Sequence, residues 1–140
     1  MWTFEQSTGS LYDPTNNLVE KGYSGNGVWK DDPASQGIHD HGPLPAGVYT
    51  IGAAIADGGH LGPFVMPLTP DPANDMCGRA GFFMHGDNIT APGTASDGCI
   101  IMSRTTRVAV NASGDKQLTV VATFDQLNDA PNAGQTDSGV

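Results

Sequence analysis

The pattern of apolar and polar positions predicts a chain of short strands joined by turns. Apolar residues alternate with polar ones on both sides of the turn at residues 7–10, which is typical of a β-hairpin. The run at residues 82–85 is apolar on both faces and is expected to be a buried strand. The predicted strands lie within residues 2–12, 48–51, 64–68, 82–85, 98–102 and 117–124.

Three local signals refine this pattern. Pro67 interrupts one of the apolar runs, so that strand is expected at an edge of the sheet, where a missing N–H costs least. Ser103 is a suitable N-cap for a short helix over residues 104–111. Residues 125–140 carry no apolar pattern, so we expect a single domain over residues 1–124 followed by a flexible C-terminal tail.

The apolar residues of these elements are expected to form one core. The predicted core consists of Trp2, Phe4, Leu11, Val48, Ile51, Phe64, Leu68, Phe82, Met84, Ile100, Met102, Val108, Leu118 and Val120.

The composition agrees with a small, mainly β domain. The chain has 140 residues, of which 19 are Gly and 10 are Pro, and only 15% are charged. Many turn-forming residues and few charges argue against a helical bundle or a coiled coil. We therefore predict a turn-rich mixed sheet or sandwich with one short helix.

The charge and the termini limit the classes of partner. The net charge is −9 and there are only six Lys and Arg, so a cationic track for nucleic acid is not expected. No run of 18 apolar residues exists, which argues against a membrane span. The first residues lack the basic and apolar regions of a signal peptide, so we expect synthesis in the cytoplasm.

A histidine and a cysteine form the most informative pair in the sequence. His85 ends one predicted strand and Cys99 begins another, so neighbouring strands would bring imidazole and thiol to one sheet end. A histidine can take the proton of a thiol and leave a nucleophilic thiolate that reacts below about pH 8. The backbone N–H groups of Gly98 and Cys99 are candidates for an oxyanion hole, and Ser96 for orienting the loop or the substrate.

These residues carry a resemblance to a known family. His85-Gly86, followed after a loop by Ser96-Asp97-Gly98-Cys99, is similar to the motif of YkuD-type L,D-transpeptidases. The chain more closely resembles the small type VI secretion L,D-transpeptidase effectors. Further matching fragments lie in the same order, at residues 6–9, 22–25, 42–49, 78–79, 83–87 and 95–100.

The resemblance implies an L,D-transpeptidase-like fold, a reaction and a setting. Cys99 would attack the carbonyl of the third residue of a peptidoglycan tetrapeptide stem. A thioester would form on Cys99, and the terminal D-alanine would leave. Water would then give L,D-carboxypeptidase trimming, and an amine would give exchange or cross-linking. His85 would act as base and then as acid, oriented by the carbonyl of Gly86 or by Asp87. The family implies injection into a rival's periplasm, an immunity protein as partner and no cofactor.

The chain departs from the YkuD pattern near the cysteine. Asp97 stands where those enzymes usually have His, and no Arg follows Cys99 within two residues. Arg79 and Arg104 are therefore the candidates for binding a substrate carboxylate. Tyr23, Asp87 and Asp97 are further candidates for substrate contacts.

Two other readings of the sequence remain open. A β-rich cell-wall or carbohydrate-binding module would use Trp2, Trp29 and Tyr23 and have an inert thiol. A metal-dependent hydrolase would use His39 and His41, although no defined metal-ligand spacing follows them and we expect no metal.

Cys77 matches no part of the motif. We expect it to be a structural thiol, and we expect no Cys77–Cys99 disulfide because that bond would block the nucleophile.

Overall fold

The structure, a computed structural model, describes residues 1–125 and is mainly β, as predicted. The strands are β1 (Trp2–Glu5), β2 (Ser10–Tyr12), β3 (Leu18–Lys21), β4 (Tyr23–Ser24), β5 (Gly47–Ile51), β6 (Ile55–Asp57), β7 (Pro63–Pro70), β8 (Phe82–His85), β9 (Ile100–Ile101) and β10 (Gln117–Val121). The helical segments are α1 (Arg104–Ala112) and three 3-10 helices, η1 (Gly27–Trp29), η2 (Pro33–Ser35) and η3 (Gly59–Leu61).

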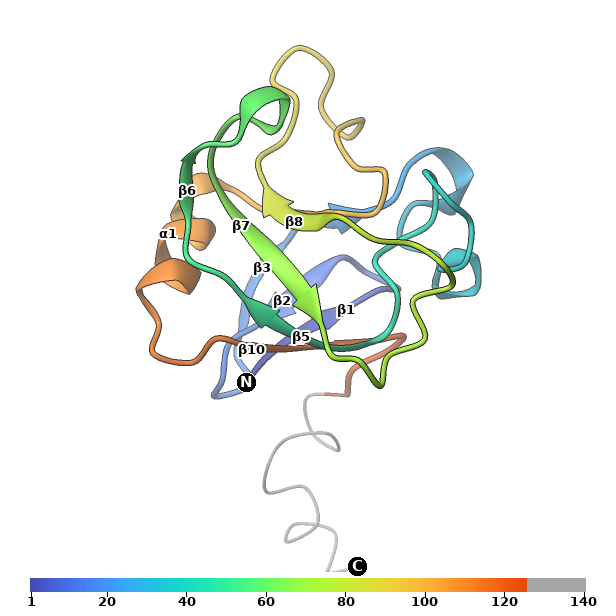
Figure 1. Cartoon of the computed structure of the whole chain (residues 1–140), viewed down its shortest axis with the longest axis horizontal. Coiled ribbons are helices and arrows are strands. Elements are labelled where there is room, and N and C mark those ends of the chain that lie inside the picture. The colour runs from blue at the N-terminus through green and yellow to red at the C-terminus, as the bar shows by residue number, and fades with distance from the viewer. Residues whose placement is uncertain (126–140) are drawn as a thin grey trace, which may run out of the picture.

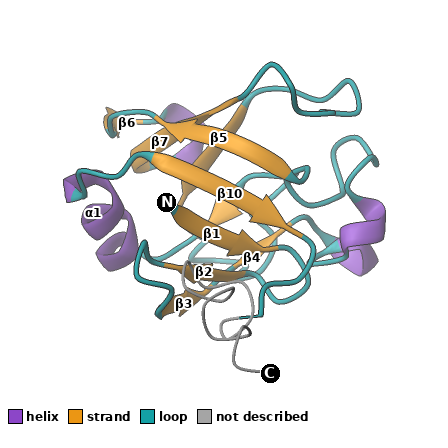
Figure 2. Cartoon of the chain, turned by 90° about the horizontal axis from the view of Figure 1, so that it is seen from below, coloured by secondary structure: helices purple, strands orange, loops and turns teal. Residues whose placement is uncertain are grey.

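The strands form one mixed sheet that almost closes on itself. Their order is β3-β2-β1-β10-β5-β7-β8-β9-β4, and β6 pairs with β7 beside this path. The two outermost strands, β3 and β4, are consecutive in the chain and only Gly22 separates them. The sheet therefore wraps around until its two edges meet, with α1 on one side and η1 and η2 on the opposite side (Figures 1 and 2).

The junction between β3 and β4, here called the seam, has no space for a side chain at residue 22. A Cβ atom on Gly22 would lie 1.8 Å from the carbonyl oxygen of Ile101. Its own N–H donates to the carbonyl of Gly9 at 2.8 Å. The chain can therefore pass from β3 to β4 only with a residue that has no side chain.

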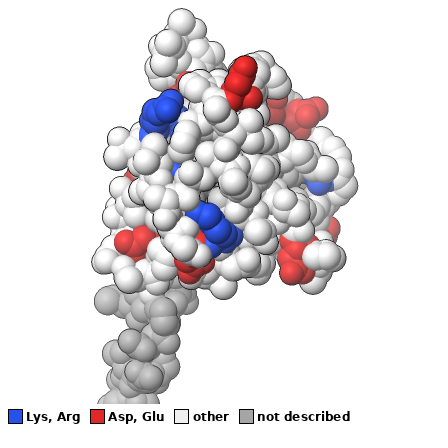
Figure 3. Space-filling model, turned by 60° about the vertical axis from the view of Figure 1, so that its left-hand side comes forward, with Lys and Arg blue, Asp and Glu red and all other residues white. Residues whose placement is uncertain are grey.

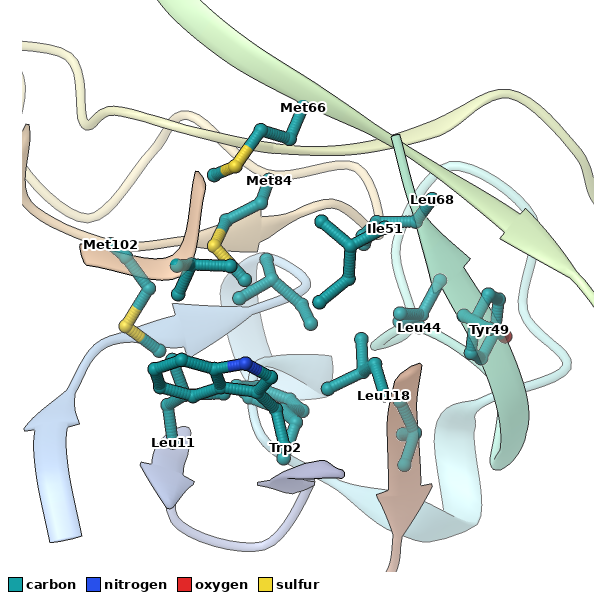
Figure 4. Close-up of a cluster of buried hydrophobic side chains, with 14 of the residues drawn as sticks. Trp2, Leu11, Leu44, Tyr49, Ile51, Met66, Leu68, Met84, Met102 and Leu118 are labelled. Carbon is teal, nitrogen blue, oxygen red and sulfur yellow. The ribbon is translucent and has the colours of Figure 1, made fainter. Parts of the chain in front are cut away.

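The sheet encloses one hydrophobic core (Figure 4). Side chains from all parts of the sheet meet there, including Trp2 from β1, Ile51 from β5 and Met84 from β8. The predicted core residues that are buried are Trp2, Phe4, Leu11, Ile51, Leu68, Phe82, Met84, Ile100, Met102, Leu118 and Val120. Buried apolar residues that the prediction missed are Tyr12, Tyr23, Leu44, Tyr49, Val65, Met66, Ile101 and Val110.

Three predicted core residues were placed wrongly. Val48 is only half-buried, because β5 turns Tyr49 and Ile51 inward and successive residues of a strand face opposite ways. Phe64 is also half-buried and lies under the guanidinium of Arg104. Val108 is 44% exposed, because α1 packs through Val110 and its neighbours on the other side of the helix.

The prediction that Pro67 marks an edge strand is also wrong, because β7 lies between β5 and β8. Pro67 is paired with Phe83. The N–H of Phe83 points away from β7, since it donates to Sγ of Cys99, and the carbonyl of Pro67 accepts from Gly52 on its other side. Pro67 and Phe83 therefore form a pair without hydrogen bonds between them, in which the missing N–H of proline costs nothing. An interior strand can hold a proline at such a position.

The helix begins where the sequence predicts. Oγ of Ser103 accepts a hydrogen bond from the backbone N–H of Thr106, and α1 ends at Ala112, one residue beyond the prediction. The last strand ends at Val121, three residues earlier than predicted. The predicted tail falls, from residue 126 onwards, outside the described residues.

Within residues 1–125, no helix has the length and apolar character that crossing a membrane requires. On the face shown in Figure 3, Lys and Arg side chains lie singly among Asp and Glu, and most of the surface is uncharged. That face has no continuous positive track of the kind that binds a phosphate backbone.

Candidate active site

The backbone of residues 96–99, here called the cysteine segment, is held by side chains on all four of its carbonyls. The segment leads directly into β9, which pairs with β8 on one side and β4 on the other. The donors to the carbonyls of Ser96, Asp97, Gly98 and Cys99 are, in that order, Nδ2 of Asn26 (3.0 Å), Nη2 of Arg79 (2.8 Å), Oγ of Ser24 (3.0 Å) and Oγ of Ser96 (2.6 Å). Four consecutive carbonyls with side-chain donors give the backbone at Cys99 a fixed course.

Ser96 braces the segment from inside. Its side chain is fully buried, and its Oγ accepts from the N–H groups of Gly25 (2.9 Å) and Gly98 (3.1 Å) while donating to the carbonyl of Cys99. The predicted orienting role of Ser96 thus has a structural basis. The same contacts engage the N–H of Gly98, which the sequence offered as one of two oxyanion donors.

Gly98 has a packing reason to be glycine. Its φ of +138° is one that side chains rarely adopt, and a Cβ would lie 2.5 Å from Nη2 of Arg79 and 2.6 Å from the ring of Phe82. The absent side chain therefore makes room for the arginine that holds the segment.

Arg79 is only 6% exposed and acts as a brace in this structure. Its Nη1 donates to the carbonyls of Gln36 (2.7 Å) and Pro43 (2.9 Å), and its Nη2 to those of Gly42 (3.0 Å) and Asp97 (2.8 Å). This arrangement ties the loop before β5 to the cysteine segment. A substrate contact of Arg79 stays a prediction.

The thiol of Cys99 is half-buried and accepts a hydrogen bond from the backbone N–H of Phe83, with 3.3 Å between N and Sγ. Burial raises the pKa of Cys99 to about 11, and the charge of Asp97 adds to this, whereas the Phe83 N–H and Arg79 oppose it. The thiol is therefore protonated at neutral pH in the resting protein. This corrects the expectation of a thiolate that persists below pH 8.

His85 is a buried, neutral imidazole whose Nδ1 is bonded to the neighbouring carbonyl. Its Nδ1 lies 2.9 Å from the carbonyl oxygen of Gly86, which can only accept, so Nδ1 carries the proton and Nε2 has a free lone pair. Burial lowers the pKa of His85, and the positive charge of Arg107 lowers it further, so the ring is neutral at pH 7. The contact with Gly86 is the one the sequence suggested.

The structure places His85 at the end of β8 and Cys99 just before the paired strand β9, with no hydrogen bond between the two side chains. Strands β8 and β9 are parallel with Met84 opposite Ile100, and continuing this register by one residue puts Cys99 beside Phe83. Among the interactions of residues 1–125, none joins Sγ of Cys99 to the ring of His85. The thiol lines a hollow of about 270 Å³ with Arg79 and Asp97. His85 lines another of about 450 Å³, between η3 and the loop that rises above β8 in Figure 1.

Tyr23 and Asp87 belong together in the structure. The hydroxyl of Tyr23 donates to Oδ1 of Asp87 at 2.6 Å and accepts from the N–H of Ala95 at 2.9 Å. Asp87 also accepts from the N–H of Gly93. The pair therefore holds both ends of the loop at residues 86–95, and it also lines a hollow of about 480 Å³.

The remaining predicted substrate contacts lie on two different hollows. Arg104 lines the hollow of about 480 Å³, and its guanidinium lies 5.1 Å from the ring centre of Phe64. Asp97 is exposed, lines the hollow of Cys99 and accepts from Nδ2 of Asn26 at 3.2 Å. Their roles toward a substrate stay predictions.

The residues of the competing readings have local partners. Nε2 of His39 is bonded to the carbonyl of Cys77 and Nδ1 of His41 to Oδ1 of Asn26. In the part of the chain that the structure describes, no three His, Cys, Asp or Glu side chains are grouped to hold a metal ion. Both cysteines are free thiols.

Sequence reasoning missed four residues of the site, which are Ser24, Asn26, His60 and Arg107. Ser24 belongs to the matching fragment at residues 22–25, and Asn26 follows that fragment directly. This position was the only indication in the sequence that either residue belongs to the site. Arg107 could have been found from helical periodicity, because it lies on the same face of α1 as Val110.

The chain matches the model of a known protein family over most of its length. The model of the Tlde1 domain matches residues 19–124, which include the whole cysteine segment and His85. The chain belongs to the Tlde1 domain family. This is a type VI secretion effector family whose domain is L,D-transpeptidase-like, and membership implies secretion. The search of curated proteins found no match. The Tlde1 match begins after β1 and β2, although both strands lie inside the sheet.

Proposed function

We propose that this Tlde1 domain is a cysteine-dependent L,D-carboxypeptidase and L,D-transpeptidase acting on peptidoglycan tetrapeptide stems. The observation that carries the proposal is the cysteine segment, whose four carbonyls are held by side chains and which leads directly into β9, the strand paired with that of His85. A neutral imidazole with a free Nε2 on the neighbouring strand is a suitable base for a protonated thiol.

The first chemical step requires the thiol to leave its resting position. Rotation about the Cα–Cβ bond of Cys99 breaks the bond from the Phe83 N–H and turns Sγ toward His85. Nε2 then takes the thiol proton, and Sγ attacks the carbonyl carbon of the third stem residue. The protonated His85 returns that proton to the nitrogen of D-alanine as the C–N bond breaks, which leaves a thioester on Cys99.

The second step regenerates the thiol. Water loses a proton to Nε2 of His85 and attacks the thioester carbonyl, the C–S bond breaks, and the protonated His85 returns that proton to Sγ, which releases the tripeptide. An amine from another stem or from a free D-amino acid gives a new amide instead. For the oxyanion in both steps, the N–H of Cys99 is a better candidate than that of Gly98, which already donates to Ser96.

The family suggests where this reaction takes place. An effector of the type VI secretion apparatus would act in the periplasm of a target cell, where peptidoglycan stems are its substrate. Its producer would need an immunity protein as a binding partner.

The test compares the two cysteines of the chain. Purified sacculi are incubated with the wild-type protein, with Cys99→Ala and with Cys77→Ala, and the muropeptides are separated. We expect the wild-type protein and Cys77→Ala to convert tetrapeptides to tripeptides, and Cys99→Ala to leave them unchanged. Conversion by Cys99→Ala would refute the mechanism.

A binding module with an inert thiol is the second candidate. The hydrogen bond that Sγ accepts and the raised pKa of Cys99 favour it. However, Trp2 is only 5% exposed and Trp29 stacks on His41, so the aromatic surface it would use is reduced. Sacculi that retain the wild-type protein without any change of muropeptides would support this candidate.

A further inference from the structure

Arg107 is a buried cation that forms no ion pair within the described residues. It lies on α1 and is only 6% exposed. Its Nη1 donates to the carbonyls of Pro63 (3.3 Å) and Phe64 (3.1 Å), and its Nε to that of Ser103 (3.4 Å). Within residues 1–125 no carboxylate forms an ion pair with it. Burial lowers the pKa of Arg107, as does the charge of Arg104, and the charge of Glu20 offsets this only in part. A buried charge whose hydrogen bonds go only to carbonyls is costly, so its presence needs a reason.

The free end of the guanidinium lies against Gly86. A Cβ on Gly86 would be 3.0 Å from Nη2 of Arg107, so the missing side chain leaves space for this nitrogen. Gly86 is also the residue whose carbonyl orients His85. Both Gly86 and Arg107 line the hollow of about 480 Å³ that Tyr23 and Asp87 also line.

The acids of this hollow are already engaged. The carboxylate of Glu20 accepts from the N–H and the hydroxyl of Ser103, and that of Asp87 accepts from Tyr23. The positive charges of Lys21 and Arg104 line the same hollow. An anion that enters therefore finds one guanidinium nitrogen with no hydrogen-bond acceptor and two further cations at the lining.

We infer that Arg107 binds a carboxylate of the substrate in this hollow, and that the ligand is a peptide with a free C-terminal carboxylate. This inference rests on the proposed function. The residue that leaves bears that carboxylate, and it must lie near His85, which protonates its nitrogen. Arg107 lies beside the residue that orients His85, whereas Arg79 has its Nη atoms bound to backbone carbonyls.

Binding at Arg107 would also act on the base. The groups that influence the charge of His85 are Arg107 and His60, which lower its pKa, and Asp87, which raises it. A bound carboxylate offsets the charge of Arg107. Nε2 of His85 then becomes more basic when the substrate is in place, at the moment when a proton must be taken from Cys99.

The experiment measures binding without catalysis. Cys99→Ala is titrated by calorimetry with a tetrapeptide stem that ends in D-alanine and with the same peptide as its C-terminal amide. We expect the acid to bind at least tenfold more tightly than the amide. The preference should vanish in Cys99→Ala/Arg107→Gln and persist in Cys99→Ala/Lys116→Gln, because Lys116 lies outside this hollow, bonded to carbonyls at the C-terminal end of α1.

A second measurement needs no loss of the arginine. The guanidinium NMR signals of Arg107, assigned with an Arg107→Lys variant, should shift in Cys99→Ala when the acid is added and not when the amide is added. Equal affinity for acid and amide, a preference that survives Arg107→Gln, or unshifted signals would each overturn the inference.

The outcome is separable from that of the proposed function. Discrimination that depends on Arg107 in a protein that leaves sacculi unchanged would support the carboxylate site and refute the reaction. Conversion of sacculi with an unchanged kcat/KM in Arg107→Gln would support the reaction and refute the site.

Discussion

The hydroxyl of Ser96 takes part in three hydrogen bonds without any exposed surface. It joins the N–H of Gly25 to the N–H of Gly98 and to the carbonyl of Cys99. A single backbone group could not make these three bonds, because an N–H only donates and a carbonyl only accepts. The hydroxyl of Ser96 accepts two hydrogen bonds and donates one through the same oxygen atom. The backbone of Gly98 and Cys99 is thus fixed by the side chain of Ser96, three residues before the candidate nucleophile.

The reactivity of Cys99 should depend on pH as that of a strongly perturbed thiol. In a Cys77→Ala background, the rate of iodoacetamide alkylation should still rise above the unperturbed pKa of about 8.5, because the pKa of Cys99 is raised to about 11. The rate is measured from neutral to alkaline pH by mass spectrometry.

Asp97→Asn provides the matched control for that measurement. It removes the negative charge that raises the pKa of Cys99, so its rate profile should move to lower pH. A wild-type profile that levels off below pH 8 would contradict the prediction, and would mean that His85 already holds the thiol proton in the resting protein.

The sequence indicates those residues of the candidate site that lie close together along the chain. His85, Gly86, Ser96 and Cys99 were found because they lie in one short stretch with a recognisable order. Arg107 was missed because its meaning comes from contacts with the start of β7, more than forty residues away. The same holds for Ser24, whose acceptor is Gly98, 74 residues later.

For the helix and the strands, too, the sequence predicts local features better than those that depend on distant contacts. The start of α1 was predicted from one residue, because Ser103 caps it locally. Its buried face was not, because Val108 and Val110 lie about 200° apart on a helix and only the position of the sheet decides between them. The phase of β5 had the same ambiguity, since Val48 and Tyr49 are both apolar and only one of them can face inward.

The seam between β3 and β4 gives a prediction about a single methyl group. Gly22→Ala should lower the free energy of unfolding by about 3 kcal/mol, because the new Cβ overlaps the carbonyl of Ile101 and must push β9 away. Urea unfolding followed by circular dichroism measures the change.

Gly114→Ala is the matched control. No atom lies within 4 Å of a Cβ at Gly114, so this variant should unfold within about 0.5 kcal/mol of the wild type. Equal stability of the two variants would show that β9 can shift without cost and that the seam is not closely packed.

The molecule as a whole depends on residues outside the family match. The Tlde1 match starts at residue 19, but β1 and β2 lie between β3 and β10 in the sheet. A fragment of residues 19–140 should therefore lack the near-ultraviolet dichroism of the full chain, because Phe4 and Leu11 are lost from the core and β10 loses its neighbour. A fragment with native dichroism would show that the sheet can close without these strands.

The pairing of the first strand with the last also determines the order of folding. Trp2 lies opposite Leu118 in a parallel pair, so almost the whole chain must emerge from the ribosome before this contact can form. Contacts between such distant residues carry a large loop-closure entropy and slow the folding of β proteins. Until β10 is synthesised, β1 and β5 each lack the neighbour that they will share, and the nascent chain exposes two unpaired strand edges. A chaperone that covers strand edges would therefore find its binding site on this protein only during synthesis.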